Sequence, residues 1–378
     1  MKKLSYVIAL ISVASLGLIF ACSSDQESDG SGSRYVEVYD YKPHYACSGA
    51  GSENAVDWVE QVLRSSDADG PPDFFAISQL ENQSIDLPEN FQALGAFCDH
   101  SGSEAYADVI GLLYDVDTWT LTGSFPIDES GNACPLTDDS SPPATCVWGE
   151  STPCCACAGD PQSTPIPDGH TIGSRAFAIG RFQDQAANEL CVVTANLPHP
   201  VTAEDQRSCD LNLPIDCLSN IENTGPFGTE NFTRQLSALC GDVAQVIFLG
   251  DTNATNPYWD LAQMFPVGIM SEMIEQDDPL YTCCFDEDPV AGSILVNQYP
   301  TDRIGARGAR SVVTTGGAAI PGVSMSAPTV YDLDSCPASS SEQSYGFPCC
   351  GSSEEHAPLR SVIDFGYSSY STVSPSGS

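Results

Sequence analysis

The chain has 378 residues, of which 51 are acidic and 13 are basic, so its formal charge at pH 7 is −38. This surplus of acids argues against a protein that wraps nucleic acid in lysine and arginine, because such binding needs cations at the phosphates. A hydrophobic content of 42% with 9% aromatic residues provides a core and argues against a disordered acidic chain. Only three lysines occur, and two of them are Lys2 and Lys3. Any chemistry must therefore come from acids, from a few histidines or from a bound cation.

The N-terminus has the pattern of an export signal. Lys2 and Lys3 precede an apolar stretch that ends at Cys22, which is typical of a secretory signal over residues 1–21. The sequence Ile-Phe-Ala-Cys at its end resembles the bacterial lipobox, in which the cysteine is lipidated. We therefore expect a lipid on Cys22, a flexible tether over residues 22–33, and a lipoprotein of the bacterial outer membrane or cell surface. The alternatives are an ordinary signal peptide of a secreted protein and an uncleaved anchor.

The cysteine content agrees with export. Seventeen cysteines occur, and sixteen remain when Cys22 is set aside. An even number of cysteines in an exported chain predicts a disulfide framework. The cluster Cys154, Cys155 and Cys157 lacks a His-x-His partner, so disulfides are favoured over zinc thiolates.

Strand-like and helix-like segments interleave from residue 35 onward. The predicted strands are 35–41, 73–79, 109–114, 118–122, 175–182, 189–196, 246–249 and 361–365. The predicted helices are 53–65 and 229–240, each with an apolar stripe at helical spacing. Strands 109–114 and 118–122 are expected to pair, and residues 126–170, rich in Pro, Asp and Cys, to form a disulfide-braced insertion. This interleaving predicts stacked sheets with helices outside them.

The first chemical motif follows the apolar strand 246–249. The chain continues as Gly250-Asp251-Thr252-Asn253, so a carboxylate and an amide two residues apart emerge on one side of a strand end. Such a pair can orient a water molecule and hold a phosphate oxygen. Taken alone, Gly-Asp-x-Asn is more often an ordinary turn.

Two further motifs follow in a defined order. Thr301-Asp302-Arg303-Ile304 comes about fifty residues later, and Glu354-Glu355-His356-Ala357-Pro358-Leu359 precedes the last strand. The order of strand with GDxN, DRI, acid–His–x–Pro–Leu and strand resembles the endonuclease/exonuclease/phosphatase superfamily. Upstream, VIGLLYDVDTWTL, RAFAIGRF with LCVVTANLPHP, and TRQLSAL resemble its preceding strands and helix. The resemblance spans about residues 35–366.

The resemblance implies a fold and a domain. The fold is an α/β (α+β) four-layer sandwich of the DNase-I-like type, in which two packed mixed β-sheets are flanked by helices. It implies one domain over residues 34–372, into which the insertion at about 126–170 is placed.

The resemblance also implies catalytic roles. Asp251 would orient or deprotonate the attacking water, Asn253 would bind the phosphate, and His356 would contact it in the transition state. Asp302 would hold His356 in position. Where the family has histidine or tyrosine after another strand, this chain has Asn196, and His199 three residues later is a candidate for the missing acid or an ordinary loop residue.

The metal site implied by the resemblance has departures. Glu355 stands where the family has aspartate beside Mg²⁺ or Mn²⁺, with Ca²⁺ as a further candidate. Asp40 stands at a family asparagine. Gln79 stands at the family's metal-binding glutamate, and Glu81 lies two residues later on the same strand face. A weakened or lost metal site is therefore one of the expectations.

The sequence thus leaves several functions open. The first is an exported, lipid-anchored, divalent-metal-dependent hydrolase of phosphomonoesters or phosphodiesters, acting as a monomer on a small phosphodiester, a phospholipid headgroup or nucleic acid. The second is a degenerate, non-catalytic family member that serves as a disulfide-braced surface binding protein. The third is an acidic calcium-binding surface module. The negative charge disfavours long nucleic acid as the substrate.

Overall fold

The computed structural model describes most of the strands and helices of the chain. The residues that it describes are 34–42, 52–65, 71–79, 84–99, 107–136, 153–158, 175–197, 229–253, 260–265, 268–275, 286–287, 294–295, 301–316, 356 and 358–366. They belong to one compact unit, Ser33–Tyr367.

The first sheet is mixed and has six strands. In spatial order these are β13 (Ser311–Gly316), β14 (Leu359–Asp364), β1 (Tyr35–Tyr41), β2 (Phe74–Ser78), β4 (Ala107–Asp115) and β3 (Phe91–Asp99). Strands β1 and β2 are parallel, and the other neighbours are antiparallel. The carboxyl ends of β1 and β2 and the amino end of β14 therefore lie at one edge of this sheet.

The second sheet is also mixed. Its strands are β12 (Asp302–Arg307), β9 (Val246–Asp251), β8 (Glu189–Asn196), β7 (Arg175–Asp184) and β5 (Trp119–Phe125), and the short β6 (Cys157–Ala158) pairs with β7. Strands β8 and β9 are parallel, and β12 is antiparallel to β9. A separate ribbon is formed by β10 (Asp286–Glu287) and β11 (Ile294–Leu295).

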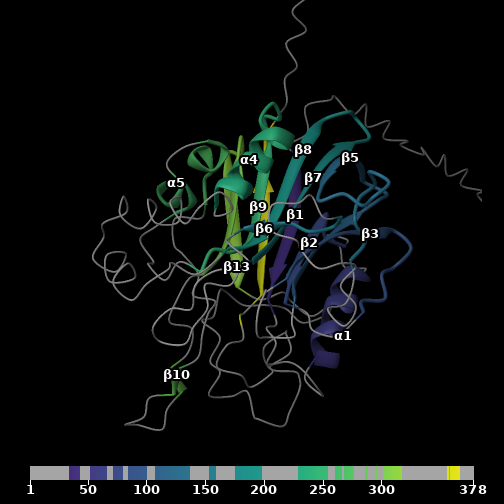
Figure 1. Ribbon diagram of the computed structural model, residues 1–378. Coiled ribbons are helices and arrows are strands. Elements are labelled where there is room, and N and C mark those ends of the chain that lie inside the picture. The colour runs from purple at the N-terminus through teal and green to yellow at the C-terminus, as the bar shows by residue number, and fades with distance from the viewer. Residues whose placement is uncertain are drawn as a thin grey trace, which may run out of the picture. The chain divides into compact units, whose positions relative to one another are not determined.

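Helices cover the outer face of each sheet (Figure 1). Helix α1 (Ser52–Leu63) packs against the first sheet, and α4 (Thr229–Cys240) packs against β5, β6, β7 and β8 of the second. Two short helical segments, α5 (Leu261–Met264) and η2 (Ile269–Glu272), follow β9. The four-layer sandwich of two mixed sheets flanked by helices that the sequence predicted is confirmed. Within the described residues, no helix is long and apolar enough to cross a membrane.

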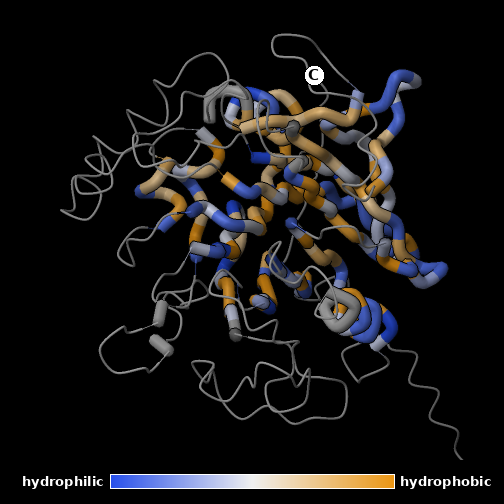
Figure 2. The backbone as a smooth tube through the Cα atoms, turned by 60° about the horizontal axis from the view of Figure 1, so that its bottom comes forward, coloured by the Kyte–Doolittle hydropathy of each residue, from blue (hydrophilic) through white to orange (hydrophobic). Residues whose placement is uncertain are grey.

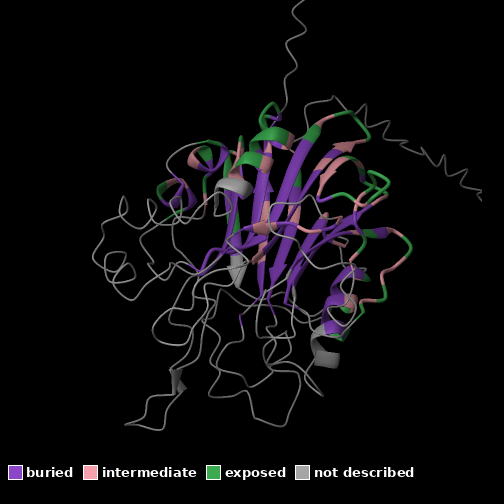
Figure 3. Cartoon of the chain, viewed as in Figure 1, coloured by how far each residue is buried: buried purple, intermediate pink, exposed green. Residues whose placement is uncertain are grey.

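Alternation along β1 explains how both faces of the first sheet are covered. Val36 and Val38 belong to the core between the sheets, whereas Tyr39 and Tyr41 pack with α1, because successive side chains of a strand point to opposite faces. Aromatic rings of the two sheets meet in this core; for example, the ring centroid of Phe74 lies 4.9 Å from that of Phe182. The strands are accordingly buried and mostly hydrophobic (Figures 2 and 3).

The predicted pairing of strands 109–114 and 118–122 is wrong. Both strands exist, but β4 pairs with β2 and β3 in the first sheet, and β5 pairs with β7 in the second. Between them the side chain of Asp115 accepts hydrogen bonds from Asp117 N (3.1 Å) and Thr118 Oγ1 (2.9 Å). This turn carries the chain from one sheet to the other, so proximity in sequence does not produce a hairpin here.

Disulfides brace the described part of the predicted insertion. Cys134 is bonded to Cys154, and Cys98 of β3 is bonded to Cys157 of β6. The backbone of Cys154 also donates to Ile127 O (3.1 Å). The insertion thus packs on β3 and β7.

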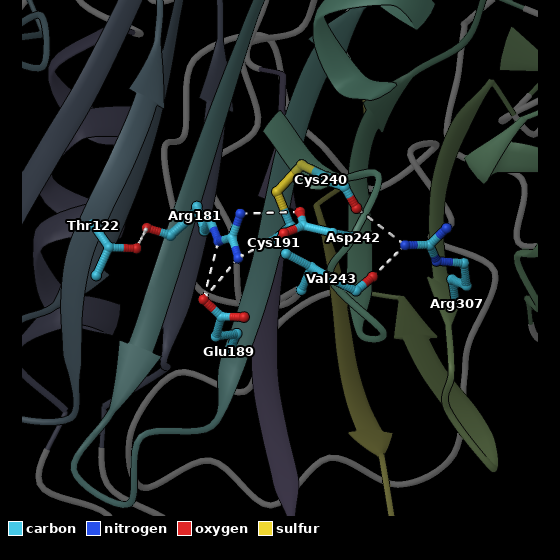
Figure 4. The surroundings of a disulfide bond; sticks show 8 residues. All are labelled: Thr122, Arg181, Glu189, Cys191, Cys240, Asp242, Val243 and Arg307. Carbon is cyan, nitrogen blue, oxygen red and sulfur yellow. Dashed lines mark hydrogen bonds and ion pairs between the residues drawn. A yellow bond between two sulfur atoms is a disulfide. The ribbon is translucent and has the colours of Figure 1, made fainter. Parts of the chain in front are cut away.

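A third disulfide joins the end of α4 to β8 (Figure 4). Cys191 is bonded to Cys240, and the guanidinium of Arg307 donates to the backbone carbonyls of Cys240 and Val243. Nearby, Arg181 pairs with Glu189 (2.8 Å) and Asp242 (3.0 Å). A cation at the carboxyl end of a helix satisfies its unpaired carbonyls. These contacts fix the turn between α4 and β9, and β9 runs from this turn to its polar carboxyl end.

Gly250 is required by the close approach of β8 and β9. Its φ is +145°, and a Cβ atom there would lie 2.0 Å from the carbonyl oxygen of Ala195. We expect Gly250→Ala to lower the free energy of unfolding by at least about 2 kcal/mol, through overpacking and backbone strain. Urea unfolding with the disulfides intact would measure this loss.

The matched control is Gly131→Ala. Gly131 also has a positive φ, +82°, but an added Cβ would meet nothing within 4 Å. Its replacement should cost only about 1 kcal/mol of backbone strain. Equal losses in the two variants would contradict the steric role of Gly250.

Candidate functional site

The polar residues singled out in the sequence gather where the two sheets end together. The first sheet supplies Asp40 and Gln79 from the ends of β1 and β2. It also supplies His356, which lies just before β14 and whose backbone N–H donates to Lys42 O (3.3 Å). The second sheet supplies four polar residues from the ends of β8 and β9 and the start of β12, namely Asn196, Asp251, Asn253 and Asp302. All the residues named in this paragraph are buried.

Three of these residues form one rung across the second sheet. Asp251 is paired with Asn196 on the parallel neighbour β8 and with Asp302 on the antiparallel neighbour β12. Carboxylates directly opposite each other repel, and burial strengthens the repulsion. Each of the two therefore needs a positive partner.

His356 is the partner of Asp302. Its Nδ1 lies 2.7 Å from Asp302 Oδ2, and both side chains are almost completely buried. An ionised carboxylate can only accept, so a hydrogen bond to ionised Asp302 requires the hydrogen on Nδ1 of His356. Arg303, the next residue after Asp302, instead reaches Glu275 (3.4 Å). Alternation along β12 explains this separation.

Lys42 is the partner of Asp251, and the sequence reasoning missed it. Its Nζ donates to Asp251 Oδ2, and its side chain is only 6% exposed. Burial alone would raise the pKa of Asp251, but Lys42, His356 and the backbone N–H of Asn253 together hold that pKa below its usual value. The available signal was that Lys42 is the single lysine besides Lys2 and Lys3 and lies two residues after Asp40.

Hydrogen bonds between amides hold the other side of Asp251. Asn253 N donates to Asp251 Oδ1 (2.7 Å), and Asn253 has a positive φ of 53°, which asparagine tolerates. Its Nδ2 donates to Asn196 Oδ1 (3.1 Å) and to Leu197 O (2.5 Å). Both N–H groups of this amide are therefore used within the protein, and in this arrangement Asn253 positions Asp251.

A buried carboxylate beneath Asn196 was also missed. Asp108 is fully buried, accepts from Ala176 N (2.7 Å) and lies within 3.3 Å of Asn196 Nδ2. It orients the amide of Asn196, which in turn receives Asn253. An acid directly before the apolar run 109–113 was the sequence signal.

Two oxygen atoms at this end have no hydrogen-bond partner among the described residues. They are Asp40 Oδ2 and Gln79 Oε1. Burial raises the pKa of Asp40 well above its usual value, the nearby Asp302 and Asp251 raise it further, and Lys42 opposes them. Gln79 has a φ of +54° at the end of β2, a strained conformation that can mark a functional position.

The donor set fits a divalent cation only in part. Ligand atoms of Asp251, Asp302 and His356 lie within 4.8 Å of one another. However, each oxygen of Asp251 already accepts a hydrogen bond, from Lys42 or from Asn253, and Oδ2 of Asp302 lies against His356. Among the described residues, Asp40 Oδ2 and Gln79 Oε1 could face a hard cation without sharing an existing hydrogen bond.

Four predicted residues cannot be compared with this geometry. Glu81, His199, Glu355 and Cys22 lie outside the described residues.

An open groove of about 750 Å³ lies elsewhere, beside β3, β4 and β5. Its lining includes Phe91, Tyr114 and Trp119, and it contains no carboxylate, imidazole or ammonium group. The chemistry therefore gathers at the strand ends and not in this groove.

Comparisons with known proteins find similarity of fold. No protein-family model matches the chain, and no curated protein matches its sequence. Similar solved structures include an endonuclease/exonuclease/phosphatase family protein from Bacteroides thetaiotaomicron, at 10% identity and a TM-score of 0.47, covering 88% of this chain and 99% of that one. The mannosyl-6-phosphatase of the same bacterium has 11% identity and a TM-score of 0.42, covering 87% and 99%. The human Nocturnin catalytic domain with bound sulfate has 12% identity and a TM-score of 0.43, covering 88% and 97%. At these identities the similarity concerns the fold alone.

Replacing Lys42 tests the charge balance of the site. In Lys42→Met, Asp251 loses its ammonium partner, so the free energy of unfolding at neutral pH should fall by about 3–5 kcal/mol. The pKa of Asp251 in the folded protein lies below its unfolded value of about 3.9. The pair therefore stabilises the wild type fully above about pH 4 and progressively less below it. Urea unfolding should show the difference between wild type and variant narrowing as the pH falls from about 4 to about 2.

The control is Arg64→Met, which removes one positive charge from an exposed pair with Glu60 and Asp86. It should change stability little at any pH. A loss in Lys42→Met that does not depend on pH would contradict the assigned ion pair.

Proposed function

We propose that the chain is a hydrolase of phosphate esters that acts at the strand ends around Asp251. The observation that carries this proposal is the convergence of His356–Asp302 and Lys42–Asp251 at one buried rung. Each pair combines a carboxylate with a group that can meet a phosphoryl oxygen. The order of the motifs in the sequence supports the same reaction.

The proposed roles follow from the contacts. Asp251 is held ionised by its neighbours, and a carboxylate with a lowered pKa is a weak base, so it orients the attacking water instead of taking its proton. His356, whose imidazole is oriented by Asp302, stabilises the charge that develops on the phosphoryl group. Asn253 and Asn196 are positioning residues of Asp251. His199 remains a proposed acid from the sequence.

The cation expected from the sequence is Mg²⁺ or Mn²⁺, with Ca²⁺ as a further candidate. Asp40 and Gln79 are the described residues that would hold it, and Glu81 and Glu355 are proposed as additional ligands. When bound, such an ion would polarise the ester for attack, a step separate from binding of the phosphate group.

Charge guides the choice of substrate. At a formal charge of −38, the protein repels long polyanions at low ionic strength. A small phosphomonoester or phosphodiester, or a phospholipid headgroup, meets less repulsion. We propose these as substrates ahead of nucleic acid.

A second function is favoured by specific features of the same site. Gln79 is a neutral amide where the resemblance places a metal-binding acid, and the N–H groups of Asn253 are already used. Both features suit a protein that binds a phosphate ester without turning it over. Such a protein would keep the fold and act as a surface receptor.

Asp251→Asn tests the hydrolase. Hydrolysis of an aryl phosphodiester and an aryl phosphomonoester should be followed with EDTA, Mg²⁺, Mn²⁺ or Ca²⁺. Loss of the charge that orients the water should lower kcat by roughly 10²–10⁴-fold. His356→Asn should cause a loss of the same order.

The matched control is Asp57→Asn, which makes the same change at an exposed position of α1 and should leave kcat unchanged. Turnover that survives Asp251→Asn would refute the hydrolase. Ligand binding without turnover by the wild type would establish the receptor instead.

The proposed location is the bacterial cell envelope, through a lipid on Cys22. The support is the signal-like N-terminus and the disulfides at Cys98–Cys157, Cys134–Cys154 and Cys191–Cys240, which suit an oxidising compartment.

Cys22→Ser should release the protein from the membrane fraction, because lipidation requires the thiol. Fractionation of expressing cells followed by immunoblotting measures this, with the wild type as reference. Unchanged membrane association would exclude a lipid on Cys22.

A further inference from the structure

Lys42 owes its burial to its place directly after β1. It follows the last residue of the strand and shares a face with Asp40 and Val38, which point toward the second sheet. Along this face, the apolar side chain of Val38 is followed by the carboxylate of Asp40 and then by the ammonium of Lys42. A buried ammonium is costly unless it is paired and hydrogen-bonded, so its contact with Asp251 is a condition of its burial.

This ammonium supplies positive charge where the rung needs it. Asp251 and Asp302 face each other across β9 and β12, and His356 Nδ1 is hydrogen-bonded to Asp302. Without Lys42, the groups among the described residues that favour the charge of Asp251 would be the backbone N–H of Asn253 and the imidazole of His356. Lys42 also acts on Asp40, the third acid of this end.

Lys42 has donors left for a ligand. An ammonium carries three N–H groups, and Asp251 is the one acceptor that Lys42 Nζ meets among the described residues. The amide of Asn253, in contrast, has spent both of its N–H groups on Asn196 and Leu197. Lys42 is therefore better placed than Asn253 to donate to a phosphate oxygen.

The same ammonium opposes a divalent ion beside Asp251. An ion bound to Asp251 would share oxygens that already accept hydrogen bonds from Lys42 and Asn253. It would also bring a double positive charge close to a buried single one. Gln79 would offer the ion an oxygen that carries no negative charge, so it would not offset the added positive charge.

We propose that Lys42 is the resident cation of this site: its ammonium, held by Asp251, takes the place of a divalent ion and binds the phosphate group of the ligand. Phosphate binding then needs no added metal. This inference rests on the proposed phosphate-ester function, and it assigns the source of positive charge within it.

The test measures binding of inorganic phosphate by isothermal titration calorimetry, with the full chain freed of metal by EDTA. The wild type should bind phosphate in EDTA, and added Mn²⁺ should not tighten the binding. Lys42→Met should weaken it at least tenfold, while Arg64→Met, with the same change in net charge at an exposed position, should not. Electron paramagnetic resonance should show that Mn²⁺ binds more tightly to Lys42→Met than to the wild type, because Asp251 has been released.

The wild type alone can overturn the inference, so the test does not depend on the variant folding. Phosphate binding that is absent in EDTA and appears with Mn²⁺ would overturn it, as would absence of phosphate binding altogether or unchanged affinity in a folded Lys42→Met. Hydrolysis is scored separately. Binding in EDTA that depends on Lys42, without turnover, supports the inference and refutes the hydrolase. Turnover that requires Mn²⁺, with phosphate binding indifferent to Lys42, supports the hydrolase and refutes the inference.

Discussion

The repulsion between two buried carboxylates governs the polar end of this fold. Asp251 and Asp302 face each other in neighbouring strands, where solvent cannot screen them. Each has a partner from the opposite sheet: the ammonium of Lys42 for Asp251 and the imidazole of His356 for Asp302. The ion pairs therefore join the two sheets at the place where their hydrophobic core ends. The same residues therefore stabilise the packing of the two sheets and form the candidate functional site.

The rest of the fold brings these groups together. Parallel pairing puts the carboxyl ends of β1 and β2 together in the first sheet and those of β8 and β9 together in the second. The antiparallel strands β14 and β12 start at these same ends. Gly250 lets β8 and β9 approach closely. The Cys191–Cys240 disulfide and Arg307 hold the turn that leads into β9. Asp108 and Asn196 then hold the amide of Asn253 under Asp251.

Local pattern predicted much of this architecture, and its failures have physical causes. The predicted strand 35–41 and helix 229–240 coincide with β1 and α4, because each buries a clear apolar face. Strand β3 was not predicted. Its Gly95 disfavours a strand locally, yet a Cβ there would lie 2.3 Å from Pro135 O, so contact with the insertion requires glycine. The hairpin expected at 109–122 fails because its two strands belong to different sheets.

The sequence by itself determined the two-sheet sandwich and most of its strands, and it singled out Asp251, Asn253, Asp302, His356, Asn196 and Asp40, which the structure brings to one place. Periodicity and motif order carry that information, since both are local properties of a strand and its end. Only the tertiary structure decided which charged side chains pair with each other. Lys42 and Asp251 are 209 residues apart in the chain, and their pairing depends on two sheets packing face to face. A long-range ion pair leaves no local pattern, so a lysine such as Lys42 becomes informative only when its neighbours in space are known.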